Sequence, residues 1–168
     1  MKKSNTVTHG KMVLYAILLL FLTGSVINCG GGGSSAPAKI NAPKTLIQDF
    51  IAKHQIMVDT ALVDFYVTEE QPEVAAAVQK AIDQTSAAGD LQKLQQATFD
   101  FSNLQIDLTG EKEEYINDEP QKIIQVSVSG SYIMEQSNEK KTIQADSTIV
   151  LQMVDNAWKV TERIHPWS

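Results

Sequence analysis

The sequence predicts an α+β domain in which N-terminal helices pack on one face of a curved antiparallel sheet of about four strands. From residue 43 to about residue 87 the apolar residues recur three or four apart, which is typical of amphipathic helices. From Phe99 onward the spacing becomes two, which is typical of strands with one buried face. Helices followed by a run of strands are the plan of an α+β fold.

The helical region divides into three segments. From Pro43 to Phe65 one apolar stripe predicts a first helix. Thr68 to Gln71 has the form of a capping box, and the stretch Val74 to Ala87 after it predicts a second helix. Gly89 is suited to end that helix, and Leu91 to Ala97 predicts a short third helix or turn.

The strand region alternates apolar and polar residues. Strands are predicted at about residues 99–108, 124–134, 143–153 and 158–162. A one-residue shift in the alternation predicts a bulge near Ser102 and Asn103. Asp155 and Asn156 suit a tight turn with positive φ, so the last two strands are predicted to form a short hairpin.

The first 28 residues have the three parts of a secretory signal peptide. Residues 1–11 carry three lysines and no acidic residue, and residues 12–23 are almost wholly apolar. A membrane-spanning helix needs ~20 apolar residues, and this run is shorter, which favours a cleaved signal peptide. An uncleaved membrane anchor is the alternative. The following Val26-Ile27-Asn28-Cys29 resembles the lipobox of bacterial lipoproteins, although Asn28 departs from the small residue usual there. The resemblance implies that Cys29 is acylated with fatty acids such as palmitate and becomes the first residue of the mature protein.

The chain after residue 28 divides into a linker and one domain. Residues 29–42 hold the acylated cysteine and a Gly/Ser/Pro-rich segment that is predicted to be flexible. Residues 43–168 are predicted to form a single α+β domain. By resemblance to lipoprotein sorting in bacteria with two membranes, Gly30 in place of aspartate implies an outer-membrane location facing the periplasm.

The globular part also has a family resemblance. Its amphipathic first helix, long hairpins and closing strand over Ala157 to Glu162 resemble the nuclear-transport-factor-two-like, or cystatin-like, cone. Ketosteroid isomerase and many small bacterial lipoproteins share that cone. The resemblance implies a sheet able to enclose a pocket, in which the family's enzymes place an Asp base with Tyr or Asp donors. Small two-helix, three-strand lipoproteins of outer-membrane assembly machines are a second candidate.

Composition and spacing exclude several classes of site. The formal net charge of −6 argues against nucleic-acid binding, because phosphate recognition needs clustered basic residues. A single cysteine cannot form an intrachain disulfide. No metal or cofactor site is predicted: beyond the leader the histidines are His54 and His165, and the acidic residues from Glu111 to Glu119 are predicted to form a solvated hairpin tip.

Two residues are candidates for lining a pocket. His54 falls on the apolar stripe of the first helix, and Tyr132 shares the apolar face of its strand. Asp100, Asp107 and Asp146 are instead predicted to lie on the polar face of the sheet, where they could not serve a cone enzyme. No catalytic set is therefore predicted.

The sequence favours a lipid-anchored cell-envelope protein with a non-catalytic binding domain. Its predicted partners are the membrane, through Cys29, and either an envelope protein or a small ligand. The alternatives are an isomerase-like or hydrolase-like cone enzyme and a structural subunit of an outer-membrane assembly complex. A fold of this kind hosts both enzymes and binding proteins, so the function has to be inferred from the residues of the site.

Overall fold

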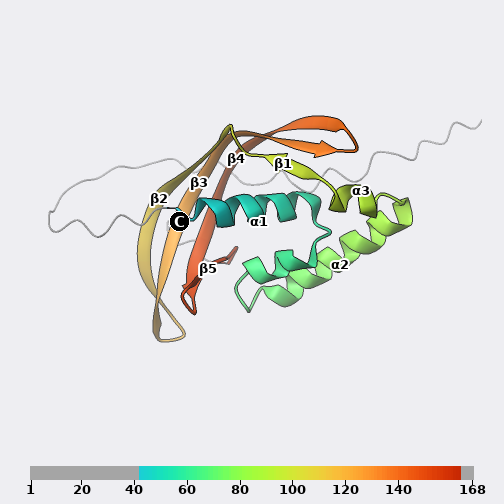
Figure 1. The fold of residues 1–168 in the computed structure, drawn as a ribbon. Helices are drawn as coiled ribbons and strands as arrows, with labels where there is room; N and C mark the ends of the chain where they lie inside the picture. Colours follow the sequence, from blue (N-terminus) through green and yellow to red (C-terminus); the bar gives the residue numbers. More distant parts are fainter. Residues whose placement is uncertain (1–41, 164–168) are drawn as a thin grey trace, which may run out of the picture. The chain divides into compact units, whose positions relative to one another are not determined.

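The computed structural model describes residues 42–163. The predicted signal peptide, Cys29 and the linker up to residue 41 lie outside the described residues, as do residues 164–168 with His165. Within the described part the helices come first and an antiparallel sheet follows, which confirms the predicted α+β class (Figure 1).

The elements have the following bounds. The helices are α1 (Lys44–Ile56), the 3-10 helix η1 (Thr60–Phe65), α2 (Gln71–Ala88) and α3 (Leu91–Gln95). The strands are β1 (Thr98–Asp100), β2 (Leu104–Ile116), β3 (Glu119–Gln136), β4 (Glu139–Val154) and β5 (Ala157–Val160).

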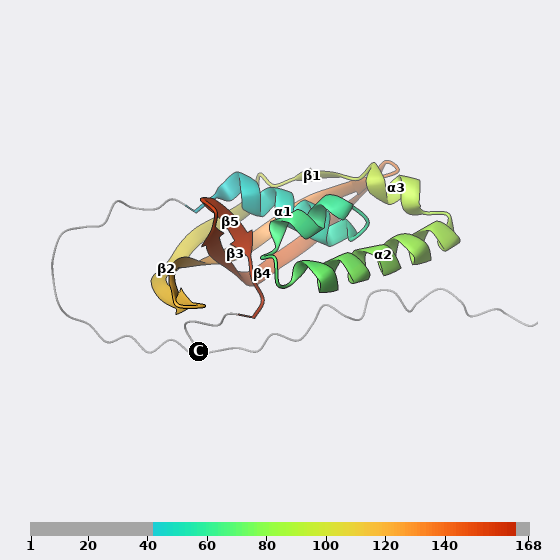
Figure 2. The same cartoon turned by 90° about the horizontal axis from the view of Figure 1, so that it is seen from below.

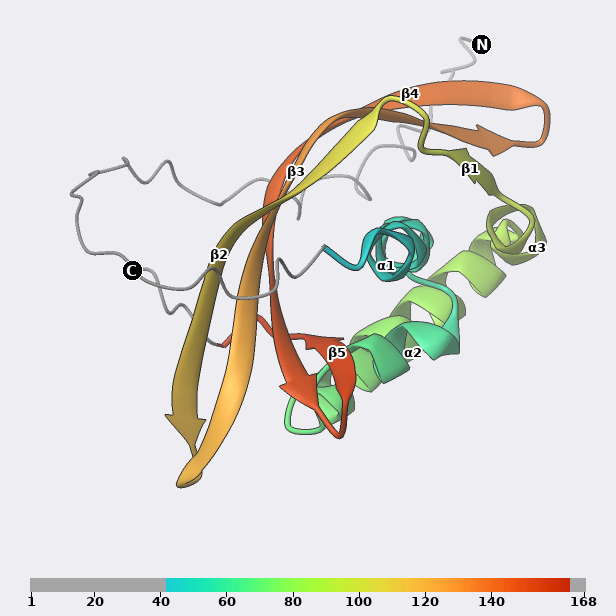
Figure 3. The same ribbon diagram turned by 60° about the vertical axis from the view of Figure 1, so that its left-hand side comes forward.

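The sheet is built around the two long strands β3 and β4. Both β1 and β2 pair with β3, one after the other along the same edge, and β4 pairs with β3 and β5. All these pairings are antiparallel. Figure 3 looks nearly along α1 and shows the sheet bending around that helix. Figure 2 shows α1, α2 and α3 on the same side of the sheet.

The predicted bulge is present between β1 and β2. Asp100 pairs with Ile133 and Leu104 pairs with Gly130, so residues 101–103 stand opposite only residues 131 and 132. Gly130 has a φ of 94°, and its neighbour Ser131 donates a backbone hydrogen bond of 3.2 Å to Asn103. The extra residue breaks the first strand into two pieces, which lets it follow the curved sheet.

Three hairpin turns of the same kind connect the strands from β2 to β5. The two central residues of each turn have positive φ, which is the geometry of a two-residue type I′ turn. These pairs are Asn117-Asp118, Ser137-Asn138 and Asp155-Asn156. The last pair confirms the turn predicted there.

The first helix is shorter than predicted. It ends at Ile56, because Met57 adopts the left-handed conformation with a φ of 56°. Asp59 then accepts a hydrogen bond of 2.9 Å from the backbone N–H of Ala61 and starts η1 as a separate helix. The apolar stripe continues across this break, because a 3-10 helix also repeats about every three residues.

Of two further predictions from local pattern, one was wrong and one was confirmed. The capping box at Thr68 does not form: α2 begins at Gln71, its N-cap is Glu70, and the Glu70 side chain makes no capping bond. The acidic residues from Glu111 to Glu119 form a largely exposed hairpin tip, as predicted, in which β2 continues to Ile116 and a two-residue turn leads into β3. Ladder pairing and ion pairs such as Lys122 Nζ to Glu111 Oε1 at 2.7 Å offset the low strand preference of the acids.

The core lies between the helices and the concave face of the sheet. Its buried members come from α1, η1, α2 and four strands: Ile47, Phe50, Leu62, Val78, Ile106, Ile124, Val126, Val128, Ile149, Leu151 and Val160, together with Tyr66 after η1. Trp158 packs against this core from β5. From Ile124 to Met134 the even-numbered residues of β3 are buried except for Gly130, as their alternation predicted.

Candidate binding cleft

A cleft with a volume of about 460 Å³ opens at one end of the core. It lies between the end of α1, η1, the first half of α2 and the segment that follows β5. Its apolar lining comes from Met57, Leu62, Val74 and Ala77, and its polar lining from His54, Tyr66, Glu70, Glu73, Glu162 and Arg163. The volume falls within the ~300 to 1,000 Å³ typical of small-molecule sites.

One face of α2 forms a wall of this cleft. Glu73, Val74 and Ala77 are three and four residues apart and therefore lie on the same side of the helix, with Glu70 at its N-cap. Val74 packs against the core at the bottom of the wall, while Glu73 and Ala77 are exposed above it. The wall thus passes from apolar to charged toward its rim.

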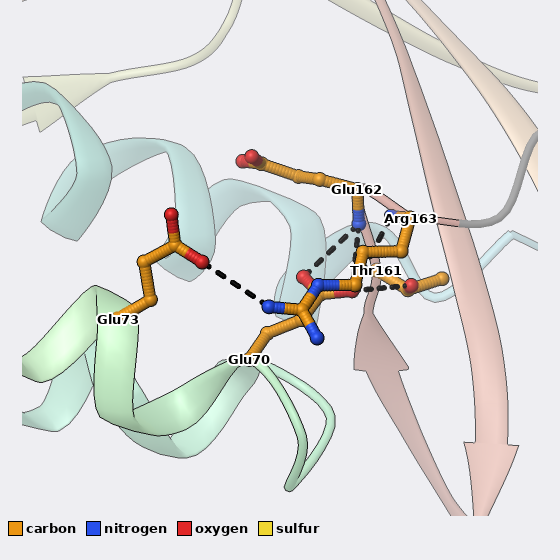
Figure 4. Close-up of polar contacts among 5 residues, drawn as sticks. All are labelled: Glu70, Glu73, Thr161, Glu162 and Arg163. Carbon is orange, nitrogen blue, oxygen red and sulfur yellow. Dashed lines mark hydrogen bonds and ion pairs between the residues drawn. The ribbon is translucent and has the colours of Figure 1, made fainter.

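The Glu70 carboxylate ties α2 to the end of the chain's last strand. Glu70 is only 5% exposed. It accepts hydrogen bonds from the Thr161 hydroxyl at 2.7 Å, from the backbone N–H of Glu162 at 3.2 and 3.1 Å, and from the backbone N–H of Arg163 at 3.3 Å (Figure 4). A buried charge is tolerated when such donors surround it. The segment 161–163, which has left the sheet, is therefore held in place as the second wall of the cleft.

The rim of the cleft carries an ion pair and a tyrosine contact. Arg163 Nη2 lies 3.1 Å from Glu73 Oε2, so the two walls are bridged at their exposed edge. The Tyr66 hydroxyl donates a hydrogen bond of 3.2 Å to Glu162 Oε1. In Figure 4 the Glu162 side chain extends away from Glu70, while its backbone N–H points at the Glu70 carboxylate. Burial, together with the charge of Glu162, raises the pKa of Tyr66.

His54 reaches the cleft from the last turn of α1. Its ring lies against Phe50, with a centroid separation of 5.4 Å. Burial lowers the pKa of His54 below 6.5, and the negative charge of Glu162 opposes that shift. The imidazole is therefore neutral at pH 7 and offers one lone pair as an acceptor.

Tyr132, the other candidate from the sequence, occupies a different place. It is buried beside Phe99 and Phe101, and its hydroxyl donates a hydrogen bond of 2.6 Å to Gln55 Oε1. Burial raises the pKa of Tyr132 to about 12. It is not among the residues that line the cleft. The structure therefore does not bring Tyr132 and His54 into one site.

The three acidic residues considered for a cone enzyme lie outside. Asp100, Asp107 and Asp146 are all exposed on their strands, as their alternation predicted. None of the three faces Tyr132. The carboxylates that line the cleft are those of Glu70, Glu73 and Glu162.

Sequence reasoning did not find these carboxylates. Glu70 was assigned to a capping box, and its true contact spans 91 residues of chain. Glu73 was not singled out, and Glu162 was considered only as part of the closing strand. Because no local pattern marks a contact across such a separation, the only available signal was the apolar side of α2 next to them.

Neither a metal-binding cluster nor a membrane-spanning helix is found in residues 42–163. No group of His, Cys, Asp and Glu in this range is placed to hold a metal ion. None of the helices in the same range is long and apolar enough to cross a bilayer. No protein-family model, curated protein or solved structure matches the chain.

Proposed function

We propose that the chain is a lipid-anchored cell-envelope protein whose domain binds a small ligand in this cleft without transforming it. The cleft is the observation that carries the proposal. Four apolar and six polar residues line it, so it can contact both an apolar and a polar part of a small ligand.

The contacts made by the acidic groups and Tyr66 in the cleft support a binding role for these groups. Glu70 is surrounded by donors from the chain, the Tyr66 hydroxyl is directed at Glu162, and Glu73 is paired with Arg163. A general base has to be free to take a proton from the substrate, and the buried Glu70 is occupied in holding segment 161–163. The Glu70 contacts fix segment 161–163 against the start of α2.

The anchor belongs to the proposal as an inference from the sequence alone. Acyl chains at Cys29 would stabilise membrane attachment by ~0.8 kcal/mol for each buried methylene group. The Gly/Ser-rich residues that follow would let the domain move near that membrane. A tethered domain would bind its ligand next to the membrane surface, as a receptor or carrier in the cell envelope has to do.

The binding proposal can be tested by filling the cleft. Ala76 and Ala77 are both exposed neighbours on α2, but only Ala77 lines the cleft. Ligand-observed NMR with the wild type identifies small molecules that bind. We expect these molecules to bind Ala76→Trp as well, and not to bind Ala77→Trp. Binding that survives Ala77→Trp, or a diverse library without any binder, would contradict the proposal.

The anchor is tested by metabolic labelling with a fatty acid in a bacterial host that processes lipoproteins. We expect label and a mass beginning at acylated Cys29 in the wild type, and neither in Cys29→Ala. Asn28→Gly restores the small residue usual before the cysteine, so it should be labelled at least as well. An unlabelled wild type that retains residues 1–28 would identify a signal-anchored protein instead.

A further inference from the structure

We infer that the cleft selects cationic ligands, in which an amidinium, guanidinium or ammonium group is attached to a small apolar body. The inference rests on the proposed binding function and specifies its ligand class. Charge gives the first argument. Three carboxylates line the cleft, and Arg163 is the only lysine or arginine among the described residues that line it. The lining therefore attracts a positive group.

The hydrogen-bonding groups of the cleft give a second, separate argument. The Tyr66 hydroxyl hydrogen is directed at Glu162. Burial keeps His54 neutral at pH 7, and a neutral imidazole has an acceptor nitrogen. Apart from the Arg163 guanidinium and the one N–H of His54, the polar side chains that line the cleft present oxygen and nitrogen lone pairs. Its best complement is a ligand with several N–H donors and no competing acceptor.

The floor of the cleft accounts for the apolar body of the ligand. Met57, Leu62 and Val74 lie at its base, and Ala77 continues the apolar side of α2. The carboxylates of Glu73 and Glu162 belong to exposed residues at the rim. A ligand that lays an apolar ring on this floor would place its charged end among those carboxylates.

The Arg163 guanidinium would compete with a cationic ligand for the Glu73 carboxylate. The guanidinium already pairs with Glu73 at 3.1 Å, although the two side chains are 58% and 81% exposed. An exposed pair of this kind is weak, so a ligand cation can replace it. Replacing each partner of this pair should have opposite effects on the affinity for a cationic ligand. Arg163→Gln should strengthen binding of a cation, and Glu73→Gln should weaken it.

The experiment compares benzamidine with benzoate, which differ in charge but share ring and size. Ligand-observed NMR titrations use the full chain in a non-ionic detergent, with detergent alone as the blank. We expect benzamidine to bind the wild type at least about fivefold more tightly than benzoate, and the difference to shrink in high salt. Glu73→Gln should weaken benzamidine binding by about two- to fivefold, and Arg163→Gln should strengthen it by a similar factor.

A matched charge change elsewhere supplies the control. Glu139 is exposed at the turn between β3 and β4, so Glu139→Gln alters the net charge equally but should leave the affinity for benzamidine unchanged. Equal or tighter binding of benzoate would overturn the cationic preference and leave the proposed binding function standing. Absence of benzamidine binding would also overturn it, while loss of library binders in Ala77→Trp tests the binding function by itself.

Discussion

The Thr161 hydroxyl donates a hydrogen bond of 2.7 Å to the Glu70 carboxylate, and 91 residues of chain separate the two. Both residues are buried, at 3% and 5% exposure. Thr161 directly follows β5, where the chain leaves the sheet and its next two N–H groups have no strand to pair with. Glu70 satisfies those groups with one charged side chain. The contact therefore joins the start of α2 to the end of the described chain.

Glu70→Gln should destabilise the domain. The amide keeps the shape but brings an NH₂ group against backbone donors, so at least one charge-assisted hydrogen bond is lost. We expect the free energy of unfolding to fall by about 2 to 3 kcal/mol in urea denaturation. Glu69→Gln, next to it but exposed, should change that energy by less than about 0.5 kcal/mol. Equal effects of the two changes would contradict the role of Glu70.

Thr161→Val removes only the hydroxyl donor and leaves the two backbone donors of Glu70 in place. The expected loss is smaller, about 1 kcal/mol, because the carboxylate remains partly satisfied. A double-mutant cycle with Glu70→Ala, which removes the acceptor, isolates the contact, and we expect a coupling energy of about 1 kcal/mol. Strictly additive losses would show that the two side chains act independently.

His54 should make the stability of the domain depend on pH. Its folded-state pKa lies below 6.5 because burial disfavours the charged imidazolium. As the pH falls below 6.5, the unfolded chain takes up a proton that the folded chain does not. The contribution of neutral His54 is thus complete above pH 6.5 and is lost as the pH falls toward the folded-state pKa. We expect the urea midpoint to fall between about pH 7.5 and pH 5.5, and the decrease to be smaller in His54→Gln.

Asp59 should stabilise η1 through its side chain. It accepts the N–H of Ala61 at 2.9 Å and also pairs with Lys53, so it fixes the start of η1 against the end of α1. Asp59→Ala should lower the free energy of unfolding by about 1 kcal/mol, the usual effect of losing an N-cap. Asp64→Ala, an exposed change within η1, is the control and should be nearly neutral. A neutral Asp59→Ala would show that packing alone defines η1.

The sheet could be predicted from the sequence because its signals are local. Alternation over the even-numbered residues of β3 placed Val126 and Val128 in the core, since a period of two fixes which side chains share a face. Asp155 and Asn156 marked their turn because these residues tolerate positive φ. Each of these signals lies within a few residues of the structure it predicts.

The cleft could not be predicted because its contacts are not local. Glu70 has the same neighbours in sequence whether it caps α2 or binds the chain after β5, and only the packed fold brings Thr161 to it. The break after Ile56 was missed for a related reason: the spacing of Leu62 and Phe65 fits a continued α-helix as well as a separate 3-10 helix.

Gly130 should be essential to the junction of β1 and β2. Its φ of +94° is unfavourable for other residues, and an added Cβ would lie 2.4 Å from the backbone oxygen of Asn103. Backbone atoms cannot swing aside as a flexible side chain can, so Gly130→Ala must displace the bulge. We expect the free energy of unfolding to fall by about 3 kcal/mol, the sum of the backbone and crowding penalties.

Gly89→Ala separates these two penalties. Gly89 ends α2 with a φ of +76°, but an added Cβ there would meet nothing within 4 Å. This change should lower the free energy of unfolding by only about 1 kcal/mol, the backbone term alone. Urea denaturation of both variants under the same conditions gives the difference between their losses in free energy of unfolding. This difference is the cost of the crowding between a Cβ at position 130 and the backbone of Asn103. Similar losses would mean that the bulge adapts to a side chain and that only the positive φ requires glycine.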